Sequence, residues 1–382
     1  MPSSAATLFQ EAFGRAPAHL VSAPGRLELL GNHTDYNAGL VLALAVDRHI
    51  HCAVAPRDDG RVRLATAAFP DIEEFALSDL RKNPRAPWAD YVKGVLQQLQ
   101  RRGVKLGGFA AAIDGTIPMG AGLSSSAALE VATALAVRRM YPFTLGGTGA
   151  ADEKMALAKL CQAAENEFVG VKCGLLDQAS SLFGRADHAI ELDFQSLAIG
   201  HAPMLGDIAI VVCNSGVKHE LVGGEYNELR ALCEAAARKL GVKFLRAVTS
   251  PELAARSGAL TARELQCARH IVGENERVAR GGRALRGGDF AAFGQLMFQS
   301  HDSSRDDFLN SSRELDLLVA LAREQPACLG ARLTGGGFGG ATINLVRRDG
   351  VDGFNEAMPR RYKERSGIEM TPLVCQIADG AE

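Results

Sequence analysis

The stretch Pro118-Met-Gly-Ala-Gly-Leu-Ser-Ser-Ser-Ala-Ala128 is a glycine–serine loop that leads directly into an apolar helix. Its two glycines let the backbone approach a bulky anion without interference from a Cβ atom. The serines 124–126 place hydroxyl and amide groups at the helix N-terminus, where unpaired N–H groups and the helix dipole favour a phosphate. The Gly-Lys-Ser/Thr ending of a Walker A loop is missing. The stretch therefore predicts a phosphate-binding loop, with a plain helix cap as the alternative.

The bulk composition points to a globular protein that binds small molecules. A chain of 382 residues is long enough for two domains. Its hydrophobic content of 47% and charged content of 23% are typical of soluble proteins. A net charge of −2 gives no electrostatic reason to expect nucleic acid or an anionic membrane surface as a partner. We expect small-molecule ligands, no nucleic acid, no membrane and a monomeric chain.

The cysteines and the hydropathy pattern favour the cytoplasm. The eight cysteines are scattered singly, without a C-x-x-C spacing, so they predict neither a zinc site nor a disulfide framework. They are typical of reduced thiols in a cytoplasmic protein. The N-terminus lacks the pattern of a signal peptide, and apolar runs such as Leu40–Val46 are too short to cross a bilayer.

The periodicity of apolar residues predicts an α+β fold. Strands come early, whereas helices and strands are mixed later, which differs from strict βαβ alternation. Strands are expected near 40–55, 61–65, 109–113, 207–213, 329–333, 341–347 and 372–376. Helices are expected near 88–102, 124–140, 152–168, 225–240, 261–280, 289–301 and 312–323. A weakly marked boundary near 195–206 divides the chain into domains of residues 1–200 and 201–382.

A polar segment lies between two apolar strands: Ala23-Pro-Gly-Arg-Leu-Glu-Leu-Leu-Gly-Asn-His-Thr-Asp-Tyr-Asn-Ala-Gly39. Hydroxyl groups of a sugar need paired donors and acceptors, which Asn32, His33, Thr34 and Asp35 supply. The segment therefore resembles a reader of small polyols. The alternative is an Asx-type turn with solvated polar side chains.

Two carboxylates stand out in the middle of the chain. Asp177, in Cys173-Gly-Leu-Leu-Asp177-Gln178, follows an apolar run and needs a partner such as an arginine to stay ionised. A structural ion pair or a helix cap is the alternative. Glu165 lies near the end of a helix, where it is able to hold Mg²⁺ together with a hydroxyl group. Glu167 is an equally good candidate by position, and either residue is compatible with a solvated helix face.

A second glycine cluster, Arg332-Leu-Thr-Gly-Gly-Gly-Phe-Gly-Gly-Ala341, lies between two apolar strands. Glycines at this density indicate backbone that passes close to a ligand or to another loop. A tight turn between strands is the alternative.

These segments, in this order, resemble the three signature motifs of the GHMP kinase family, most closely those of its galactokinases. The matching segments are Arg26 with Gly31–Gly39, Gly120–Ser126 and Thr334–Gly340. Further galactokinase-like segments are Cys173–Gln178, Asn214–His219, Glu225-Tyr226 and Ser303–Asp307. The resemblance covers nearly the whole chain. It implies a two-domain fold, with an N-terminal domain like domain 2 of ribosomal protein S5 and a ferredoxin-like C-terminal domain.

The resemblance also implies an ATP-dependent sugar-1-kinase that phosphorylates the anomeric hydroxyl of galactose. Asp177 would be the catalytic base or orient the sugar hydroxyl, and Arg26 would pair with it and stabilise the transferring phosphoryl group. The implied sugar-binding residues are Asn32, His33, Thr34, Asp35, Gly174 and Tyr226. The implied ATP-binding residues are Gly120, Ala121, Gly122, Leu123, Ser124, Ser125 and Ser126. Ser126 and Glu165 would hold Mg²⁺.

One departure from the family pattern concerns substrate choice. The family motif carries Glu at the position of Asn32 and Asn at the position of Glu28, so the carboxylate and the amide are exchanged. We hypothesise that the two have traded places around the C6 hydroxyl of the sugar, which would favour a sugar with an altered C6 group. The alternative is that position 28 only supports the loop. Related kinases of N-acetylgalactosamine or arabinose, and sensors that bind sugar and ATP without turnover, are the rival functions.

Overall fold

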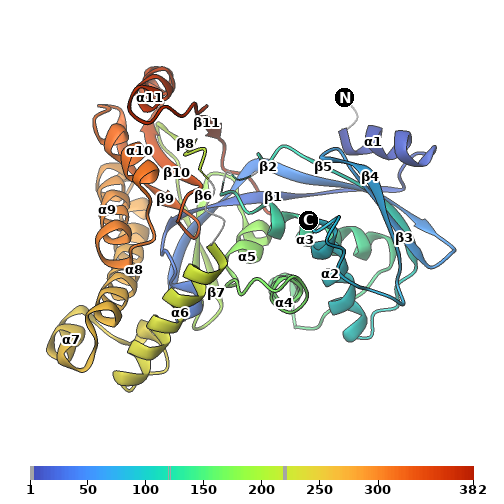
Figure 1. The fold of residues 1–382 in the computed structure, drawn as a ribbon, viewed down its shortest axis with the longest axis horizontal. Helices are drawn as coiled ribbons and strands as arrows, with labels where there is room; N and C mark the ends of the chain where they lie inside the picture. Colours follow the sequence, from blue (N-terminus) through green and yellow to red (C-terminus); the bar gives the residue numbers. More distant parts are fainter. Residues whose placement is uncertain (1–3, 119, 121, 218–221) are drawn as a thin grey trace.

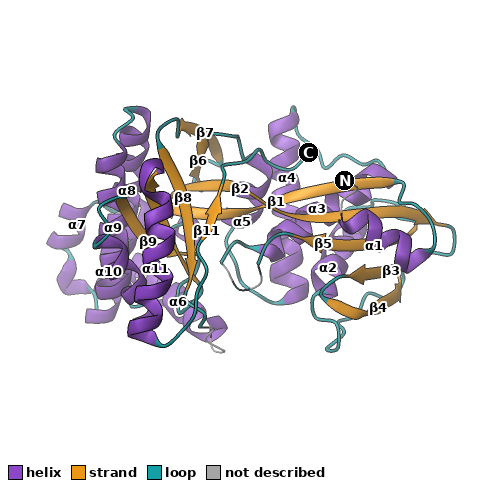
Figure 2. Cartoon of the chain, turned by 90° about the horizontal axis from the view of Figure 1, so that it is seen from above, coloured by secondary structure: helices purple, strands orange, loops and turns teal. Residues whose placement is uncertain are grey.

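The structure is a computed structural model that describes residues 4–118, 120, 122–217 and 222–382. Figure 1 shows the first half of the chain on the right and most of the second half on the left, each built around a β-sheet. Within the described residues, one sheet has the order β4-β3-β5-β2-β6-β7 with β1 paired to β2, and the other has the order β11-β8-β10-β9. Figure 2 shows the same two groups of strands from above.

The first sheet is organised by one long central strand. Its strands are β1 (His19–Leu30), β2 (Leu40–Arg57), β3 (Arg61–Thr66), β4 (Phe69–Ala76), β5 (Gly108–Gly115), β6 (His188–Asp193) and β7 (Ala198–Pro203). Strand β2 pairs antiparallel with β1, β5 and β6. β1 and β2 form a hairpin whose connection is the polar segment that follows β1. The hairpin thus places that segment at one end of the sheet.

Helices cover both faces of this sheet. The helices are α1 (Ser4–Phe13), α2 (Ala89–Arg101), α3 (Ser125–Met140), α4 (Ala150–Ala163), the π-helix η2 (Ala164–Val169) and α5 (Leu176–Phe183). Helices α2 to α5 pack their apolar side chains into the main core. On the opposite face, Phe9 of α1 packs against the small side chains of Ala53, Ala55, Ala110 and Ala112. Because side chains alternate along a strand, alanines at every second position leave room for that helix.

The second sheet carries the other group of helices. Its strands are β8 (Ile208–Asn214), β9 (Cys328–Thr334), β10 (Ala341–Arg347) and β11 (Leu373–Cys375). The helices are α6 (Val222–Lys239), α7 (Ser250–Ala255), α8 (Ala262–Arg286), α9 (Phe290–Ser303), the π-helix η5 (Ser304–Phe308), α10 (Arg313–Arg323) and α11 (Val351–Ser366). Short 3₁₀ turns complete the list: η1 (Asp35–Asn37), η3 (Leu245–Ala247), η4 (Ser257–Ala259) and η6 (Arg348–Gly350). Strands β9 and β10 form a hairpin whose connection is the glycine cluster after Arg332.

Helix α8 and the C-terminal segment both contact the first sheet. Gly281 of α8 lies so close to β1 and β2 that a Cβ atom there would come within 2.7 Å of Leu30 and 3.1 Å of Leu42. The residues after β11 return to the first sheet, where Ala378 N–H donates to the carbonyl of Ala45. Both figures show the C-terminus beside the elements of the first half.

Most of the expected elements are present, and the α+β class is confirmed. Helix α8 continues to Arg286, six residues beyond the expected end. Elements that the periodicity did not indicate are α1, α5, α7, α11, β4, β6 and β7. The proposed boundary at 200/201 lies inside β7, a few residues before the second sheet begins at Ile208, and it stays a prediction.

Two further observations concern the cysteines and the helices. All eight cysteines lie among the described residues, and none forms a disulfide. In the part of the chain that the structure describes, no helix has the length and apolar character needed to cross a bilayer.

Candidate active site

The glycine–serine loop does not end in an ordinary helix cap. Gly120 and Gly122 have φ values of +72° and +70°, in the left-handed region that favours glycine. Ser124 precedes α3 with a φ of +53°, and among the described residues its side chain makes no capping hydrogen bond. Instead, its Oγ donates to Oδ2 of Asp177 at 2.5 Å. Left-handed backbone at a non-glycine residue is a strained arrangement that clusters at functional sites.

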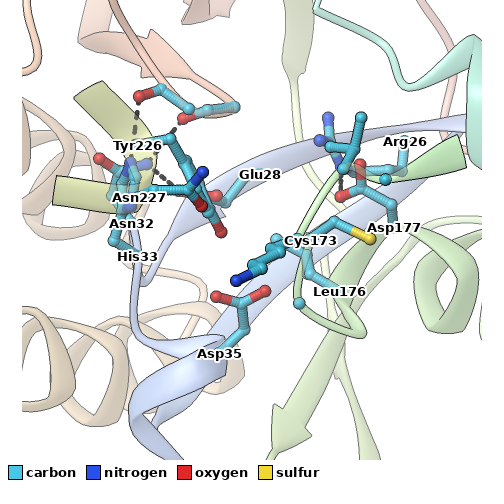
Figure 3. A pocket seen from close by; sticks show the side chains of 16 residues that line it. Arg26, Glu28, Asn32, His33, Asp35, Cys173, Leu176, Asp177, Tyr226 and Asn227 are labelled. Atoms are coloured by element: carbon cyan, nitrogen blue, oxygen red, sulfur yellow. Dashed lines mark hydrogen bonds and ion pairs between the residues drawn. The ribbon is translucent and has the colours of Figure 1, made fainter. Parts of the chain in front are cut away.

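The other oxygen of Asp177 is paired with an arginine. Asp177 lies in the first turn of α5, and Arg26 lies on β1. Arg26 Nε donates to Asp177 Oδ1 at 2.6 Å (Figure 3). Its Nη1 donates to the carbonyl of Gly122 at 2.8 Å. Burial opposes the charge on Arg26, but the adjacent Asp177 outweighs it and raises the arginine pKa. The structure thus joins the two expected catalytic residues directly to the glycine–serine loop.

A cavity of about 360 Å³ opens beside this ion pair. Residues from the polar segment, the start of α5, α6 and the second glycine cluster line it (Figure 3). Of the expected sugar-binding residues, Asn32, His33, Asp35, Gly174 and Tyr226 all reach the cavity wall. Thr34 is the exception. Its hydroxyl is buried and donates to the carbonyls of Gly31 and Leu40, so it shapes the turn and is not part of the wall.

Asp35 and Gly174 form one compact part of the wall. A Cβ atom on Gly174 would lie 1.5 Å from Asp35 Oδ2, so the position requires glycine. Burial raises the pKa of Asp35 to about 7, and the nearby carboxylates of Glu28 and Asp177 add to the shift. A cavity with this many carboxylate oxygens is suited to ligands that donate hydrogen bonds, as sugar hydroxyls do.

His33 is a neutral structural part of the wall. Burial lowers its pKa to about 4. Its Nε2 donates to the carbonyl of Gly336 at 3.0 Å, so its Nδ1 accepts from the hydroxyl of Tyr36 at 2.8 Å. The ring of Tyr226 packs against it with centroids 4.9 Å apart. Both ring nitrogens are therefore committed to protein partners.

Glu28 and Asn32, the exchanged pair, are in direct contact. Asn32 Nδ2 donates to Glu28 Oε1 at 3.1 Å and to the carbonyl of Gly335 at 2.7 Å. Asn32 Oδ1 accepts from Asn310 Nδ2 at 2.8 Å. Behind the cavity, Arg332 NH1 lies 2.7 Å from Glu28 Oε1 in a buried ion pair.

Helix α8 holds the polar segment through a residue that sequence reasoning missed. The fully buried Glu274 accepts from the backbone N–H groups of Gly31 and Asn32 at 2.8 and 3.0 Å. Burial disfavours its charge, but Arg277 and other cationic neighbours outweigh burial and lower the Glu274 pKa. Glu274 is more than 240 residues away from the turn, so no local pattern pointed to it.

The structure separates the two candidate metal carboxylates. Glu165 is buried and accepts from Gln178 Nε2 at 2.9 Å, and the Ser126 hydroxyl also bonds to it. Burial and the charge of Asp177 raise the pKa of Glu165 to about 7. Glu167 instead pairs with Arg101 on the surface, at 2.5 Å. Glu165 is therefore the carboxylate that faces the loop.

A third carboxylate, Glu130 on α3, was also missed. It is fully buried, and its Oε2 accepts from the same Gln178 Nε2 at 2.9 Å. Burial and the neighbouring Glu165 raise its pKa well above the usual value. The apolar sequence around Glu130 gave the appearance of an ordinary buried helix face. No group of three or more His, Cys, Asp and Glu residues with metal-binding geometry is found in the described part of the chain.

A second cavity, of about 420 Å³, adjoins the first. The glycine–serine loop contributes Gly120, Gly122 and Ser124, and the β9–β10 connection contributes residues 334–340. Arg26, Gly335 and Gly336 line both cavities. The second glycine cluster is therefore a turn between strands and also a wall of both cavities.

Of the expected ATP-binding set, Leu123, Ser125 and Ser126 are described by the structure but are not among the residues that line this second cavity. Leu123 is buried in the main core, and its carbonyl accepts from Arg26 N–H at 3.1 Å. Ser125 is exposed at the start of α3. Ala121, and Lys218 and His219 of the galactokinase-like segment, lie outside the described residues.

Family models match three parts of the chain. The GHMP kinases N terminal domain matches residues 90–185, the galactokinase galactose-binding signature residues 7–56, and the GHMP kinases C terminal domain residues 283–364. Galactokinases of Chloroflexus aurantiacus and a Roseiflexus species are 44% and 41% identical, over 97% of this chain and 95% and 94% of theirs. The chain belongs to the galactokinase family of GHMP kinases.

Solved structures agree with this family. The galactokinase of Lactococcus lactis, crystallised with galactose, superposes with a TM-score of 0.93 at 33% identity, covering 99% of this chain and 98% of its own. Mevalonate kinase of Methanococcus jannaschii has a TM-score of 0.65 at 17% identity, with 94% and 98% covered, and shares the fold. The chain has the two-domain GHMP kinase fold and is a kinase that uses ATP to phosphorylate a sugar hydroxyl.

Proposed function

We propose that the sugar is galactose, and that the kinase transfers the γ-phosphoryl group of ATP to its anomeric hydroxyl to form galactose 1-phosphate. The observation that supports this most is the position of the Arg26–Asp177 pair, 2.6 Å apart, where the sugar-sized cavity meets the glycine–serine loop. A group bound in one cavity would face a group bound in the other across this pair.

Asp177 is the proposed base. As the anomeric oxygen forms its bond to the γ-phosphorus, its proton passes to the Asp177 carboxylate and ADP leaves with the electrons of the broken P–O bond. Ser124 and Arg26 hold the carboxylate from two sides, which fixes its direction. Arg26 also covers the negative charge on the transferring group, a role that positioned cations fill in phosphoryl transfer.

The proposed nucleotide site is the loop of residues 120–126. Its backbone amides and the N-terminus of α3 face phosphate oxygens, with Ser124 to Ser126 adding hydroxyl groups. The left-handed glycines at 120 and 122 let the backbone follow the phosphates closely.

Mg²⁺ fits the residues beside this loop. Glu165 is a buried carboxylate crowded by Asp177, and the Ser126 hydroxyl is bonded to it, so a divalent cation there would offset like charges. Hard oxygen donors suit Mg²⁺, which keeps few protein ligands when substrate phosphates supply others. We propose that Ser126 and Glu165 hold the ion, which when bound would neutralise charge on the phosphates.

The proposed sugar site is the first cavity. Asp35 accepts from sugar hydroxyls, Gly174 keeps the carboxylate in place by having no side chain, and Tyr226 offers its ring and hydroxyl to the sugar. Asn32 and His33 complete the wall with side chains held by protein partners. We also propose that residues 1–200 and 201–382 are the two domains, with a boundary that lies within three residues of the end of the first sheet at Pro203.

The test is a coupled ADP-release assay with ATP and Mg²⁺ on galactose, N-acetylgalactosamine and arabinose. Galactose is expected to give the highest kcat/KM. Asp177→Asn is expected to lower kcat by about 10²–10⁴-fold, while calorimetry still detects sugar binding. Asp79→Asn, which removes an exposed carboxylate paired with Arg81, is the matched control and should leave kcat unchanged.

Two outcomes would contradict the proposal. Sugar binding without ADP release by the unaltered protein would identify a sensor. A higher kcat/KM for one of the other two sugars would reassign the substrate.

A further inference from the structure

The wall of the sugar cavity opposite Asp177 has few free polar atoms. Both amide hydrogens of Asn32 are donated to protein acceptors, and its oxygen accepts from Asn310. Both ring nitrogens of His33 are likewise bonded. Neither side chain has a donor left for a sugar unless a protein contact is broken.

Glu28 is different, because one of its carboxylate oxygens has no protein partner. Oε1 accepts from Asn32 and Arg332, whereas among the described residues no group donates to Oε2. Glu28 lines the cavity, and Oε2 is not among the fully enclosed polar atoms that lack partners. Figure 3 shows Glu28 between the Asn32–His33 side of the cavity and the Arg26–Asp177 pair.

The neighbours of Glu28 fix this free oxygen in place. Arg332 has a side chain that is 0% exposed, and Glu28 is the ion partner that the described residues provide for it. An unpaired buried guanidinium would lower the stability of the fold. The ion pair with Arg332 therefore keeps Oε1 of Glu28 on the side of the cavity wall that faces the protein interior. Asn32 holds the same oxygen from the side of the glycine cluster. The carboxylate therefore keeps Oε2 directed away from these two partners.

We propose that Glu28 is a specificity-determining residue whose Oε2 accepts a hydrogen bond from one sugar hydroxyl other than the phosphorylated one. Asn32 is then a positioning residue that connects Glu28 to the carbonyl of Gly335. The inference rests on the proposed function in one respect, namely that the cavity binds a sugar.

The test combines a variant with a panel of sugars. Binding of galactose and of its 2-, 3-, 4- and 6-deoxy analogues is measured by calorimetry without nucleotide, for the unaltered protein and for Glu28→Gln. A hydrogen bond to a charged group predicts that removing the relevant hydroxyl weakens binding to the unaltered protein by about 10- to 100-fold. We call the loss of affinity on removal of one hydroxyl its penalty. In Glu28→Gln, the penalty at the relevant position is expected to shrink to a few-fold, while the penalties at the other three positions stay unchanged.

The matched control is Glu73→Gln, which neutralises a carboxylate in another buried ion pair, with Lys93, away from the cavity. It should leave all four penalties unchanged. If Glu28→Gln fails to fold because Arg332 loses its counter-ion, the double variant Glu28→Gln/Arg332→Met removes both buried charges and is used instead.

A second measurement needs no variant. A fluorine in place of the hydroxyl keeps an acceptor but loses the donor, so beside a carboxylate the fluoro sugar should bind no better than the deoxy sugar. If instead an Asn32 N–H group donates to that hydroxyl, the fluoro sugar should recover part of the affinity.

The inference is overturned if the four penalties in Glu28→Gln equal those of the unaltered protein, if all four fall together, or if fluorine restores binding. The proposed function fails separately, when galactose binds but no ADP is released. Because the binding panel does not depend on turnover, the two failures are distinguishable.

Discussion

Gly174 leaves no room for a side chain, because its Cα lies against the Asp35 carboxylate. In Gly174→Ala, the new methyl group would overlap Asp35 Oδ2, which lies 1.5 Å from the ideal Cβ position. We expect the carboxylate to move and the KM for the sugar to rise by about tenfold or more, the cost of one hydrogen bond to a charged group. The KM for ATP should change little. Steady-state kinetics with each substrate varied in turn measure both values.

The matched control is Gly353→Ala in α11, where no atom lies within 4 Å of the added Cβ. That variant should keep both KM values and gain stability, because alanine is the better helix former. Equal KM values for Gly174→Ala and the unaltered protein would remove Asp35 from the sugar site.

Glu165 should make nucleotide binding depend on pH. Its pKa of about 7 means that about a tenth of the molecules carry the ionised carboxylate at pH 6 and about nine tenths at pH 8. Because a cation binds the ionised form, the affinity for Mg²⁺–ADP should rise about tenfold between these pH values, with loss of a proton on binding. Calorimetry in buffers of different ionisation enthalpy measures both quantities.

In Glu165→Gln, the protein's share of this pH dependence should disappear, leaving the titration of the nucleotide itself. Glu167→Gln, two residues away on the surface, serves as the control and should behave like the unaltered protein. An unchanged pH profile in Glu165→Gln would show that this carboxylate does not meet the metal.

At the scale of elements, helix α8 supports the sugar cavity from behind. Glu274→Gln removes the charge that pairs with Arg277 and weakens the acceptor for the N–H groups of Gly31 and Asn32. Breaking a buried ion pair in this way should lower the free energy of unfolding by about 3–5 kcal/mol. Urea denaturation followed by circular dichroism measures the loss.

Glu276→Gln on the same helix is the control, since its carboxylate is exposed and accepts from Ser250. That change should cost less than about 1 kcal/mol. A similar small loss in Glu274→Gln would mean that the turn holds its shape without the helix.

The sequence predicted elements with a strong local signal and missed those without one. The strand that begins at Leu40 and the helix after Ser124 were predicted because the apolar residues in each follow the pattern of a single type of secondary structure. Helix α11 was not, since Pro359 interrupts it and polar residues fill most of its length. Strands β6 and β7 are short. Their position is fixed by the pairing of β6 with β2 and of β7 with β6, which a local pattern cannot show.

The same distinction holds for the site. Arg26, Asp177 and the glycine clusters lie in motifs, so a single sequence was enough to select them as candidates, and the structure places them next to one another. The anchors Glu274 and Asn310 act through contacts with residues more than 240 positions away, and Glu130 lies hidden in an apolar helix. Residues of this kind are found only when the chain is folded.

At the scale of the whole molecule, the C-terminal segment ties the two halves together. Backbone hydrogen bonds join Gln376 to Asp47, Ala378 to Ala45, and Gly380 and Ala381 to the end of α5. Removal of residues 376–382 should lower the free energy of unfolding by about 4 kcal/mol, at about 1 kcal/mol for each backbone hydrogen bond. It should also lower kcat, because α5 carries Asp177. Thermal unfolding and the ADP-release assay measure the two effects.

Removal of Glu382 alone is the control, since this exposed residue makes none of those bonds. Full stability in the longer truncation would show that the remaining contacts between the halves, those of α8 and of the Glu28–Arg332 pair among them, are enough to hold the halves together.

The wall shared by the two cavities has a thermodynamic consequence. Arg26, Gly335 and Gly336 line both cavities. A ligand bound in one cavity therefore alters part of the binding surface of the other. Linkage between two binding equilibria is reciprocal. If bound sugar changes the affinity for the nucleotide by some factor, bound nucleotide therefore changes the affinity for the sugar by the same factor. Where this coupling is favourable, each product bound in its own cavity would increase the affinity of the other cavity for the second product.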